Sequence, residues 1–224
     1  MKTAFIFAAG RGERLKPLTD HKPKALCTIH GIPLIEYHVQ NLARAGFERL
    51  IINHAYLGGQ IKQHFSHGAP FGLEILYAPE PPGGLETGGG IVNVLSLLGS
   101  EPFATINADI VTDFPFDTLC LPASGLTHLV LIKTPSYLLQ ADFGLNTARY
   151  VENTHRQYTF SGIACHHPRR FQSLHPGRYS LTPLLRFWAN HHEVSGEVYE
   201  GEWCDVGTPD RLEELNIRTS SLRY

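Results

Sequence analysis

The stretch TAFIFAAGRGERLKPLTDHKPKAL, residues 3–26, decides how the rest of the chain is interpreted. It begins with a short apolar run over residues 3–8 that Gly10 closes, which is the pattern of a buried parallel strand. A loop rich in glycine, proline and basic residues follows directly. This segment therefore contains both the first predicted strand and a candidate anion site.

Strands and helices alternate after this loop. Apolar runs predict the strands, and apolar residues at helical spacing predict the helices between them. The second half is more mixed and includes a bent hairpin over 194–207. This order predicts an α/β fold with one domain, residues 1–224, built as a Rossmann-like, mostly parallel mixed sheet flanked by helices. The expected strands are 3–8, 49–55, 73–78, 103–109, 127–134 and 158–167, and the expected helices are 33–46, 57–65, 87–99, 181–192 and 208–218.

The composition excludes several classes of protein. The formal net charge of -2 argues against a general nucleic-acid binder, which usually carries a basic excess. The first apolar run is too short for a secretory signal, and no stretch approaches the roughly 20 apolar residues of a membrane helix. The four cysteines are far apart and form no C-x-x-C pair, which indicates reduced thiols and a cytoplasmic protein.

The spacing G-x-G-x-R-L at residues 10–15 suggests two familiar phosphate-binding motifs, but the segment matches neither of them. A dinucleotide fingerprint needs a third glycine where Leu15 stands, and it needs a helix that begins at the loop. Pro17 and Pro23 keep the loop irregular instead. No G-K-[ST] follows, so the segment is not a Walker loop either.

A phosphate site of another kind fits the same residues. Gly10 and Gly12 let backbone N–H groups approach phosphate oxygens closely. Arg14 can grip two phosphate oxygens, and Lys24 can place a point charge on another phosphate. The alternative is a solvated basic loop without a ligand.

Two carboxylates follow predicted strands at the places where ligands gather in open α/β sheets. Asp109 ends one strand, and Asp205 ends an apolar segment near the C-terminus. Two carboxylates and the oxygens of a nucleoside triphosphate suit Mg²⁺. Asp113 is a competitor for this role. The adjacent histidine pairs at 166–167 and 191–192 do not suit one ion, because neighbouring side chains in a strand point to opposite faces.

Five motifs, in this order along the chain, resemble those of the sugar-1-phosphate nucleotidyltransferases. They are G-x-G-x-R-L-x-P-L-T-x-x-x-P-K-x-L (10–26), LETGGG (85–90), NADI (107–110), FSGI (160–163) and WCDVGTP (203–209). Within that family the chain is most similar to bacterial N-acetylmuramate 1-phosphate uridylyltransferases of cell-wall recycling. The segments 33–58, LETGGGI (85–91) and 194–208 carry this closer likeness. Mannose-1-phosphate guanylyltransferases share most of the motifs.

The resemblance implies an activity and a set of roles. The enzyme would transfer a nucleoside monophosphate from a triphosphate, UTP in the uridylyltransferase group, to a hexose 1-phosphate and release pyrophosphate. Mg²⁺ would be the cofactor on Asp109 and Asp205, with Arg14 and Lys24 as catalytic residues. Ala108 stands where the family commonly has glycine. The implied nucleotide contacts are Ala9, Gly10, Gly12, Glu86, Thr87 and Gly88, and the implied sugar-phosphate contacts are Asn107, Gly144, Ser161 and Gly162.

Other functions remain open at this point. One is a mannose-1-phosphate guanylyltransferase or a glucose-1-phosphate thymidylyl- or uridylyltransferase. Another is a catalytically silent regulatory subunit with the same fold. The chain ends near residue 224, so we expect no β-helix extension and no appended acetyltransferase. Partners would be the triphosphate and the sugar 1-phosphate, with neither nucleic acid nor membrane, and no oligomeric state is indicated.

Overall fold

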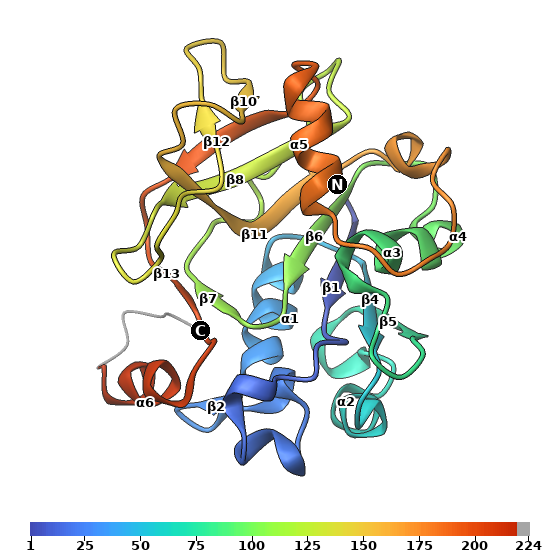
Figure 1. Ribbon diagram of the computed structural model, residues 1–224. Helices are drawn as coiled ribbons and strands as arrows, with labels where there is room; N and C mark the ends of the chain where they lie inside the picture. Colours follow the sequence, from blue (N-terminus) through green and yellow to red (C-terminus); the bar gives the residue numbers. More distant parts are fainter. Residues whose placement is uncertain (219–224) are drawn as a thin grey trace.

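A seven-stranded sheet forms the centre of the molecule in the computed structural model, which describes residues 1–218 (Figure 1). Its strand order is β12-β8-β11-β6-β1-β4-β5, and only β11 runs antiparallel to its neighbours. The predicted α/β class with a mostly parallel mixed sheet is confirmed. The strands are β1 (Thr3–Phe7), β4 (Arg49–His54), β5 (Glu74–Pro79), β6 (Phe103–Asn107), β8 (Thr127–Lys133), β11 (Tyr158–His166) and β12 (Ser195–Tyr199).

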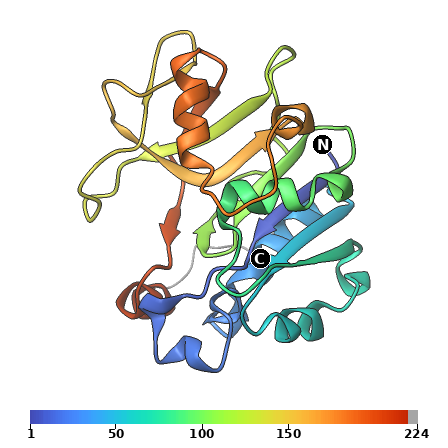
Figure 2. The same ribbon diagram turned by 45° about the vertical axis from the view of Figure 1, so that its right-hand side comes forward.

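Helices cover both faces of this sheet, and β1 shows why. Ala4 and Ile6 belong to one buried cluster with apolar residues of α1 and α2, whereas Phe5 belongs to a second cluster with residues of α3, α4 and α5. Successive strand residues point to opposite faces, so an apolar run buries both. Figure 2 shows α3 and α5 on one side of the strands. The helices are α1 (Leu34–Arg44), α2 (Gly58–Phe65), α3 (Glu86–Asn93), α4 (Leu95–Leu98), α5 (Thr182–Asn190) and α6 (Pro209–Ile217).

The segment 8–26 contains only short 3₁₀ turns, which agrees with the predicted irregular loop. The turns are η1 (Glu13–Leu15), η2 (Leu18–Asp20) and η3 (Lys24–Leu26). Pro17 and Pro23 precede the second and third turns. A proline removes a backbone donor and restricts the residue before it, so the loop cannot become one helix.

The predicted hairpin over 194–207 is wrong. Its first half, β12, pairs in parallel with β8 in the main sheet. Its second half, β13 (Trp203–Asp205), pairs instead with β7 (Ile110–Thr112) in a separate two-stranded ribbon. The two halves have partners from distant parts of the chain, and local sequence pattern does not report such pairing.

The predicted helix 87–99 is two helices, α3 and α4, because the chain leaves helical geometry at Val94, where φ is −108° and ψ is 7°. The remaining short strands are β2 (Thr28–Ile29), β3 (Ile32–Pro33), β9 (Gly144–Leu145) and β10 (Val151–Glu152). None of the helices in residues 1–218 is both long and apolar enough to cross a membrane.

Candidate active site

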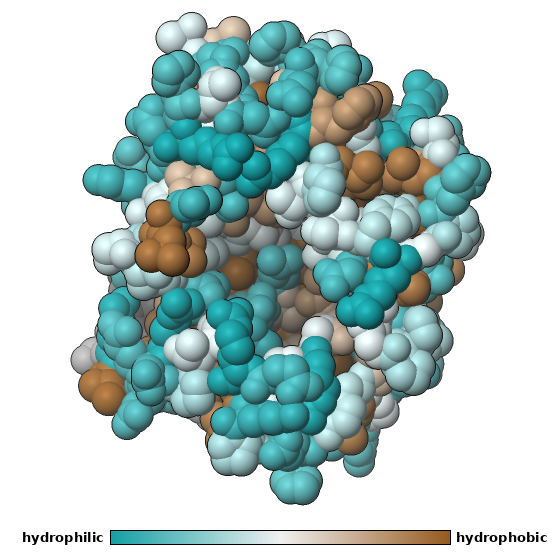
Figure 3. Space-filling model, viewed as in Figure 1, coloured by the Kyte–Doolittle hydropathy of each residue, from teal (hydrophilic) through white to brown (hydrophobic). Residues whose placement is uncertain are grey.

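A cleft of about 910 Å³ lies at the carboxyl ends of the parallel strands β1, β4, β5 and β6. Figure 3 shows a hollow in this face of the molecule, with hydrophilic residues around its rim. Loops at this edge of a parallel sheet converge on a common space, which is why ligands gather there. Predicted site residues that line the cleft are Ala9, Gly10, Lys24, Glu86, Thr87, Asn107 and Asp109.

The glycine-rich loop folds back on itself and brings Lys24 to the cleft. Gly12 has a φ of +70°, and its carbonyl accepts a 2.9 Å hydrogen bond from the Thr19 hydroxyl. A Cβ on Gly12 would lie 2.9 Å from Cβ of Lys24. Gly12 therefore serves the close approach of two loop segments, and only glycine adopts this φ without strain.

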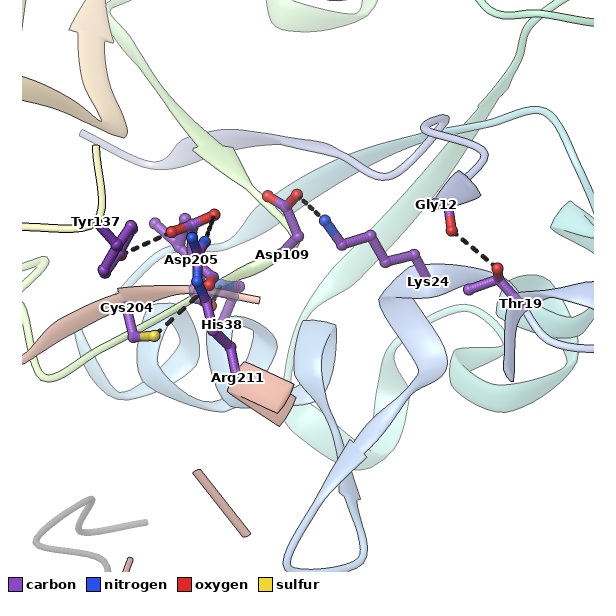
Figure 4. Close-up of polar contacts among 10 residues, drawn as sticks. Gly12, Thr19, Lys24, His38, Asp109, Tyr137, Cys204, Asp205 and Arg211 are labelled. Carbon is purple, nitrogen blue, oxygen red and sulfur yellow. Dashed lines mark hydrogen bonds and ion pairs between the residues drawn. The ribbon is translucent and has the colours of Figure 1, made fainter. Parts of the chain in front are cut away.

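Lys24 forms an ion pair with Asp109 (Figure 4). The lysine side chain is 12% exposed and the aspartate side chain 35%. Asp109 lies between the end of β6 and the start of β7. Lys24, which is predicted to contact a phosphate group, and Asp109, which is predicted to hold a metal ion, are therefore in direct contact.

Asp205 is brought beside Asp109 by the β7–β13 ribbon. In this ribbon Asp205 is paired with Ile110, and the Val206 N–H donates a 2.7 Å hydrogen bond to the Asp109 carbonyl. Figure 4 shows Asp109 with Lys24 on one side and Asp205 on the other. Asp205 does not line the cleft itself but lies next to a residue that does.

Both oxygens of the Asp205 carboxylate are hydrogen-bonded. Arg211 donates to Oδ2 at 2.6 Å, and the Tyr137 hydroxyl donates to Oδ1 at 2.7 Å. The Arg211 guanidinium also lies 3.8 Å from the centre of the Tyr137 ring. Burial, with the Asp205 carboxylate as a further cause, raises the pKa of Tyr137 above its usual value, so the phenol stays a donor.

Arg14 is exposed and lies outside the lining of the cleft. It is nevertheless close to the Asp205 turn, because a Cβ on Gly207 would be 3.2 Å from both Nη atoms of Arg14 and 2.9 Å from Oδ2 of Asp205. The structure places Arg11 in the cleft lining instead. Arg11 donates to the Thr19 carbonyl at 2.6 Å and stacks 3.7 Å over the Tyr56 ring.

The segment 177–181, which we call the strap, covers the start of α3. The N–H groups of Gly88 and Gly89 donate to the Tyr179 carbonyl at 3.0 and 3.1 Å, and the Leu181 N–H donates to the Thr87 hydroxyl at 2.9 Å. A Cβ on Gly88 would lie 2.7 Å from the Tyr179 ring. Gly88 thus packs under the strap and is not part of the cleft lining, whereas Glu86 and Thr87 are.

The four predicted sugar-phosphate residues separate into two groups. Asn107 lines the cleft, and Gly162 packs against it: a Cβ on Gly162 would lie 2.6 Å from the Asn107 amide nitrogen. Ser161 is buried, with its hydroxyl donating to the Val130 carbonyl at 2.7 Å. Gly144 packs on the backbone at Thr154. Ser161 and Gly144 therefore serve the bulged strand β11 and the strand β9 in this structure.

Sequence reasoning missed several polar residues of the cleft lining, among them Arg11, Asn53, Glu80 and Arg178. Asn53 lies near the end of the expected strand 49–55, and Glu80 lies two residues beyond the expected strand 73–78. Polar residues near the carboxyl ends of parallel strands are a signal for a ligand site. Asp113, the competitor for the metal role, accepts hydrogen bonds from the Tyr199 hydroxyl and, at 2.7 Å, from the Glu202 N–H. It therefore fixes a turn.

Comparison with known proteins agrees with this architecture. Residues 3–149 match the model of the nucleotidyl transferase family. The N-acetylmuramate alpha-1-phosphate uridylyltransferase of Neisseria meningitidis serogroup B is 43% identical over 220 residues, 94% of this chain and 95% of the relative. The enzyme of the same name from Caulobacter vibrioides is 30% identical over 226 residues, 93% of each chain.

A solved structure with low sequence identity shares the fold. It is the inositol-1-phosphate CTP transferase from T. maritima, with a TM-score of 0.81 at 16% identity, covering 96% of this chain and 95% of the other. The five motifs, the confirmed fold class and the two relatives lead to one assignment. The chain belongs to the nucleotidyl transferase family, among the sugar-1-phosphate nucleotidyltransferases.

Proposed function

We propose that this protein transfers a uridylyl group from UTP to N-acetylmuramate 1-phosphate and releases pyrophosphate. The observation that carries the proposal is the ion pair of Lys24 and Asp109 in the cleft lining, with Asp205 beside Asp109, in a chain that matches uridylyltransferases over nearly its whole length. Charges of both signs at the carboxyl edge of a parallel sheet suit a reaction between two phosphate groups.

The reaction balances without a catalytic base. A phosphate oxygen of the sugar 1-phosphate is already an anion, and it forms a bond to the α-phosphorus of UTP. The bond between the α-phosphorus and the oxygen that bridges to the β-phosphate breaks, and pyrophosphate leaves with that electron pair. The protein has to bring two polyanions together in line and offset their charge.

Residues of this chain would align the two substrates and offset their charge. Lys24 would place its ammonium group on the α-phosphate, and Arg14 would hold the departing pyrophosphate. The N–H groups that follow β1 at Ala9 and Gly10 would approach phosphate oxygens. Glu86 and Thr87 lie on the cleft wall that would receive the nucleoside.

The carboxylates fit Mg²⁺. Within residues 1–218 no group of three or more His, Cys, Asp or Glu side chains could hold a metal ion. Asp109 and Asp205 are hard oxygen ligands on neighbouring backbone, and Mg²⁺ takes few protein ligands when phosphate oxygens and water complete its shell. When bound, Mg²⁺ would neutralise phosphate charge, and Asp109 and Asp205 would hold it.

Measurement of pyrophosphate release tests the proposal. The purified protein is incubated with UTP, GTP, dTTP or CTP and with N-acetylmuramate, mannose or glucose 1-phosphate. We expect the highest turnover with UTP and N-acetylmuramate 1-phosphate. Preference for GTP and mannose 1-phosphate would make the protein a guanylyltransferase, and no release with any pair would favour the regulatory subunit.

Two conservative variants test the carboxylates. Asp109→Asn and Asp205→Asn keep side-chain volume and remove the charge that a cation needs, so turnover should fall by roughly 100-fold or more. Both variants should remain folded in a thermal melt. Asp117→Asn, at an exposed aspartate outside the cleft lining, is the matched control and should keep full activity.

A further inference from the structure

Three hydrogen bonds in series connect two segments that both line the cleft, the loop that follows β1 and the start of α3. The Ala8 N–H donates to Oδ1 of Asn53, Nδ2 of Asn53 donates to Oε1 of Glu80, and the Leu85 N–H donates to Oε2 of Glu80. Each donor–acceptor distance is 2.7 Å. Asn53 is 2% exposed and Glu80 9%. The series thus spans from the end of β1, through the ends of β4 and β5, to the start of α3.

The direction of these hydrogen bonds determines which types of side chain fit at positions 53 and 80. Both ends of the series are backbone N–H groups, which can only donate. An amide such as Asn53 accepts from one end and donates onward. The next side chain must then accept on both sides, and a carboxylate does this because both of its oxygens are acceptors. Asn53 and Glu80 satisfy every group in the series.

A glycine leaves room for the series. A Cβ on Gly90 would lie 3.0 Å from Oε1 of Glu80 and 3.2 Å from Nδ2 of Asn53. Both distances are shorter than normal contact, and the two side chains could not both give way without lengthening their hydrogen bonds. The glycine run of α3 therefore allows the helix to pack directly on this network.

We propose that Asn53 and Glu80 are positioning residues that hold these two cleft-lining segments in the relative position that nucleotide binding needs, an inference that rests on the proposed function. Ala8 directly precedes Ala9 and Gly10, and Leu85 directly precedes Glu86 and Thr87. All four of these following residues line the cleft. Anchoring the amides of Ala8 and Leu85 to one buried network fixes the two segments relative to each other.

Exchange of the two side-chain types provides the sharpest test. In Glu80→Gln, every orientation of the two amides leaves one N–H facing another N–H. In Asn53→Asp, two carboxylates face each other. The double variant, which combines Asn53→Asp with Glu80→Gln, again places an acceptor opposite every donor in the series. Its carboxylate at position 53 accepts from the Ala8 N–H and from the new amide at position 80, whose oxygen accepts from the Leu85 N–H. Glu74→Gln, at an exposed residue of β5, is the matched control.

The affinity for UTP is measured by calorimetry without sugar phosphate, beside a thermal melt. We expect each single variant to weaken UTP binding about tenfold or more, and the double variant to bind within about threefold of the wild type. The control should bind like the wild type. Single variants that melt lower but bind UTP normally would reduce the network to a structural role and overturn the proposal. A double variant no better than the worse single variant would overturn it as well.

Hydrogen exchange at the amides of Ala8 and Leu85, in the protein without nucleotide, separates this inference from the proposed function. Both amides should be protected in the wild type and the double variant, and should exchange faster in the single variants. If the wild type shows this protection but binds no nucleoside triphosphate, the proposed function fails and the positioning role fails with it. Normal UTP binding with unprotected amides in the wild type would overturn the network alone.

Discussion

Lys24 and Asp109, 85 residues apart in the chain, form an ion pair at the cleft. Lys24 is proposed to contact phosphate, and Asp109 is proposed to hold a cation. Their opposite charges therefore neutralise each other in the free protein. Asp205 is similarly occupied by Arg211 and Tyr137. A cation that enters this site has to compete with the protein's own positive charges, and a phosphate that draws Lys24 away would free Asp109.

Removing the lysine charge should therefore strengthen metal binding to the free protein. Lys24→Met keeps a long side chain but frees the Asp109 carboxylate. We expect the dissociation constant for Mn²⁺, measured without nucleotide from the paramagnetic resonance signal of the free ion, to fall roughly tenfold. Lys22→Met removes an exposed lysine from the same loop and should change the value far less. Equal or weaker Mn²⁺ binding in Lys24→Met would contradict this competition.

Arg14→Ala should reduce catalysis with little effect on folding. Arg14 is exposed and takes part in no hydrogen bond or ion pair found within residues 1–218, so the free energy of unfolding should change by no more than about 0.5 kcal/mol. A lost charge contact to the departing pyrophosphate should lower turnover about 100- to 1,000-fold. Arg14→Lys should recover part of it, because an ammonium group cannot grip two oxygens as a planar fork does.

The assay is turnover at saturating UTP and sugar 1-phosphate, beside a melt of each variant. Lys16→Ala, an exposed change on the same loop, is the control and should keep its activity. Near-normal turnover in Arg14→Ala would mean that this arginine belongs to a solvated basic turn.

Gly89→Ala should release the strap from α3. A Cβ at this position would lie 2.0 Å from the Gly177 carbonyl oxygen, so backbone has to shift. We expect a loss of roughly 1–3 kcal/mol in the free energy of unfolding, measured by denaturant titration. Gly59→Ala, an exposed helical position with open space around it, should instead stabilise by about 0.4–1 kcal/mol. Equal stability of the two variants would show that the strap does not pack as described.

His166 should make the fold sensitive to acid. Burial, with Arg170 as a second cause, lowers the pKa of His166 to about 3, against about 6.5 in the unfolded chain. Between these values the unfolded chain binds a proton that the folded chain does not. Stability is therefore fully present above pH 6.5 and is lost as the pH falls toward 3, at up to about 1.4 kcal/mol per pH unit.

Denaturant titrations between pH 7.5 and 4.5 measure this slope. His166→Gln cannot titrate, so its stability should fall less steeply with acid than that of the wild type. His67→Gln, at an exposed histidine, should leave the slope unchanged. Parallel slopes in the wild type and His166→Gln would mean that other groups cause the acid sensitivity.

The spacing of apolar residues predicted most helices and strands, because the formation of these elements depends on residues close together in the chain. The apolar run at 3–8 became β1, and the amphipathic segment 33–46 became α1, since burial of one or both faces follows from the spacing of apolar residues. The expected helix 87–99 is instead two helices, because the chain leaves helical geometry at Val94, and the spacing of apolar residues does not report such a break. The hairpin 194–207 failed because each half pairs with a different, distant strand.

The sequence by itself determined the α/β class, the loop at the end of β1 and the family, since these depend on residue spacing and on motifs in order. Only the tertiary structure decided what lies together. The β7–β13 ribbon sets Asp205 beside Asp109, the Gly12 turn lets Lys24 reach Asp109, and Asn53 meets Glu80 across two strands. Such contacts join residues far apart along the chain, and they exist only after strand order and register are fixed by packing of the whole sheet.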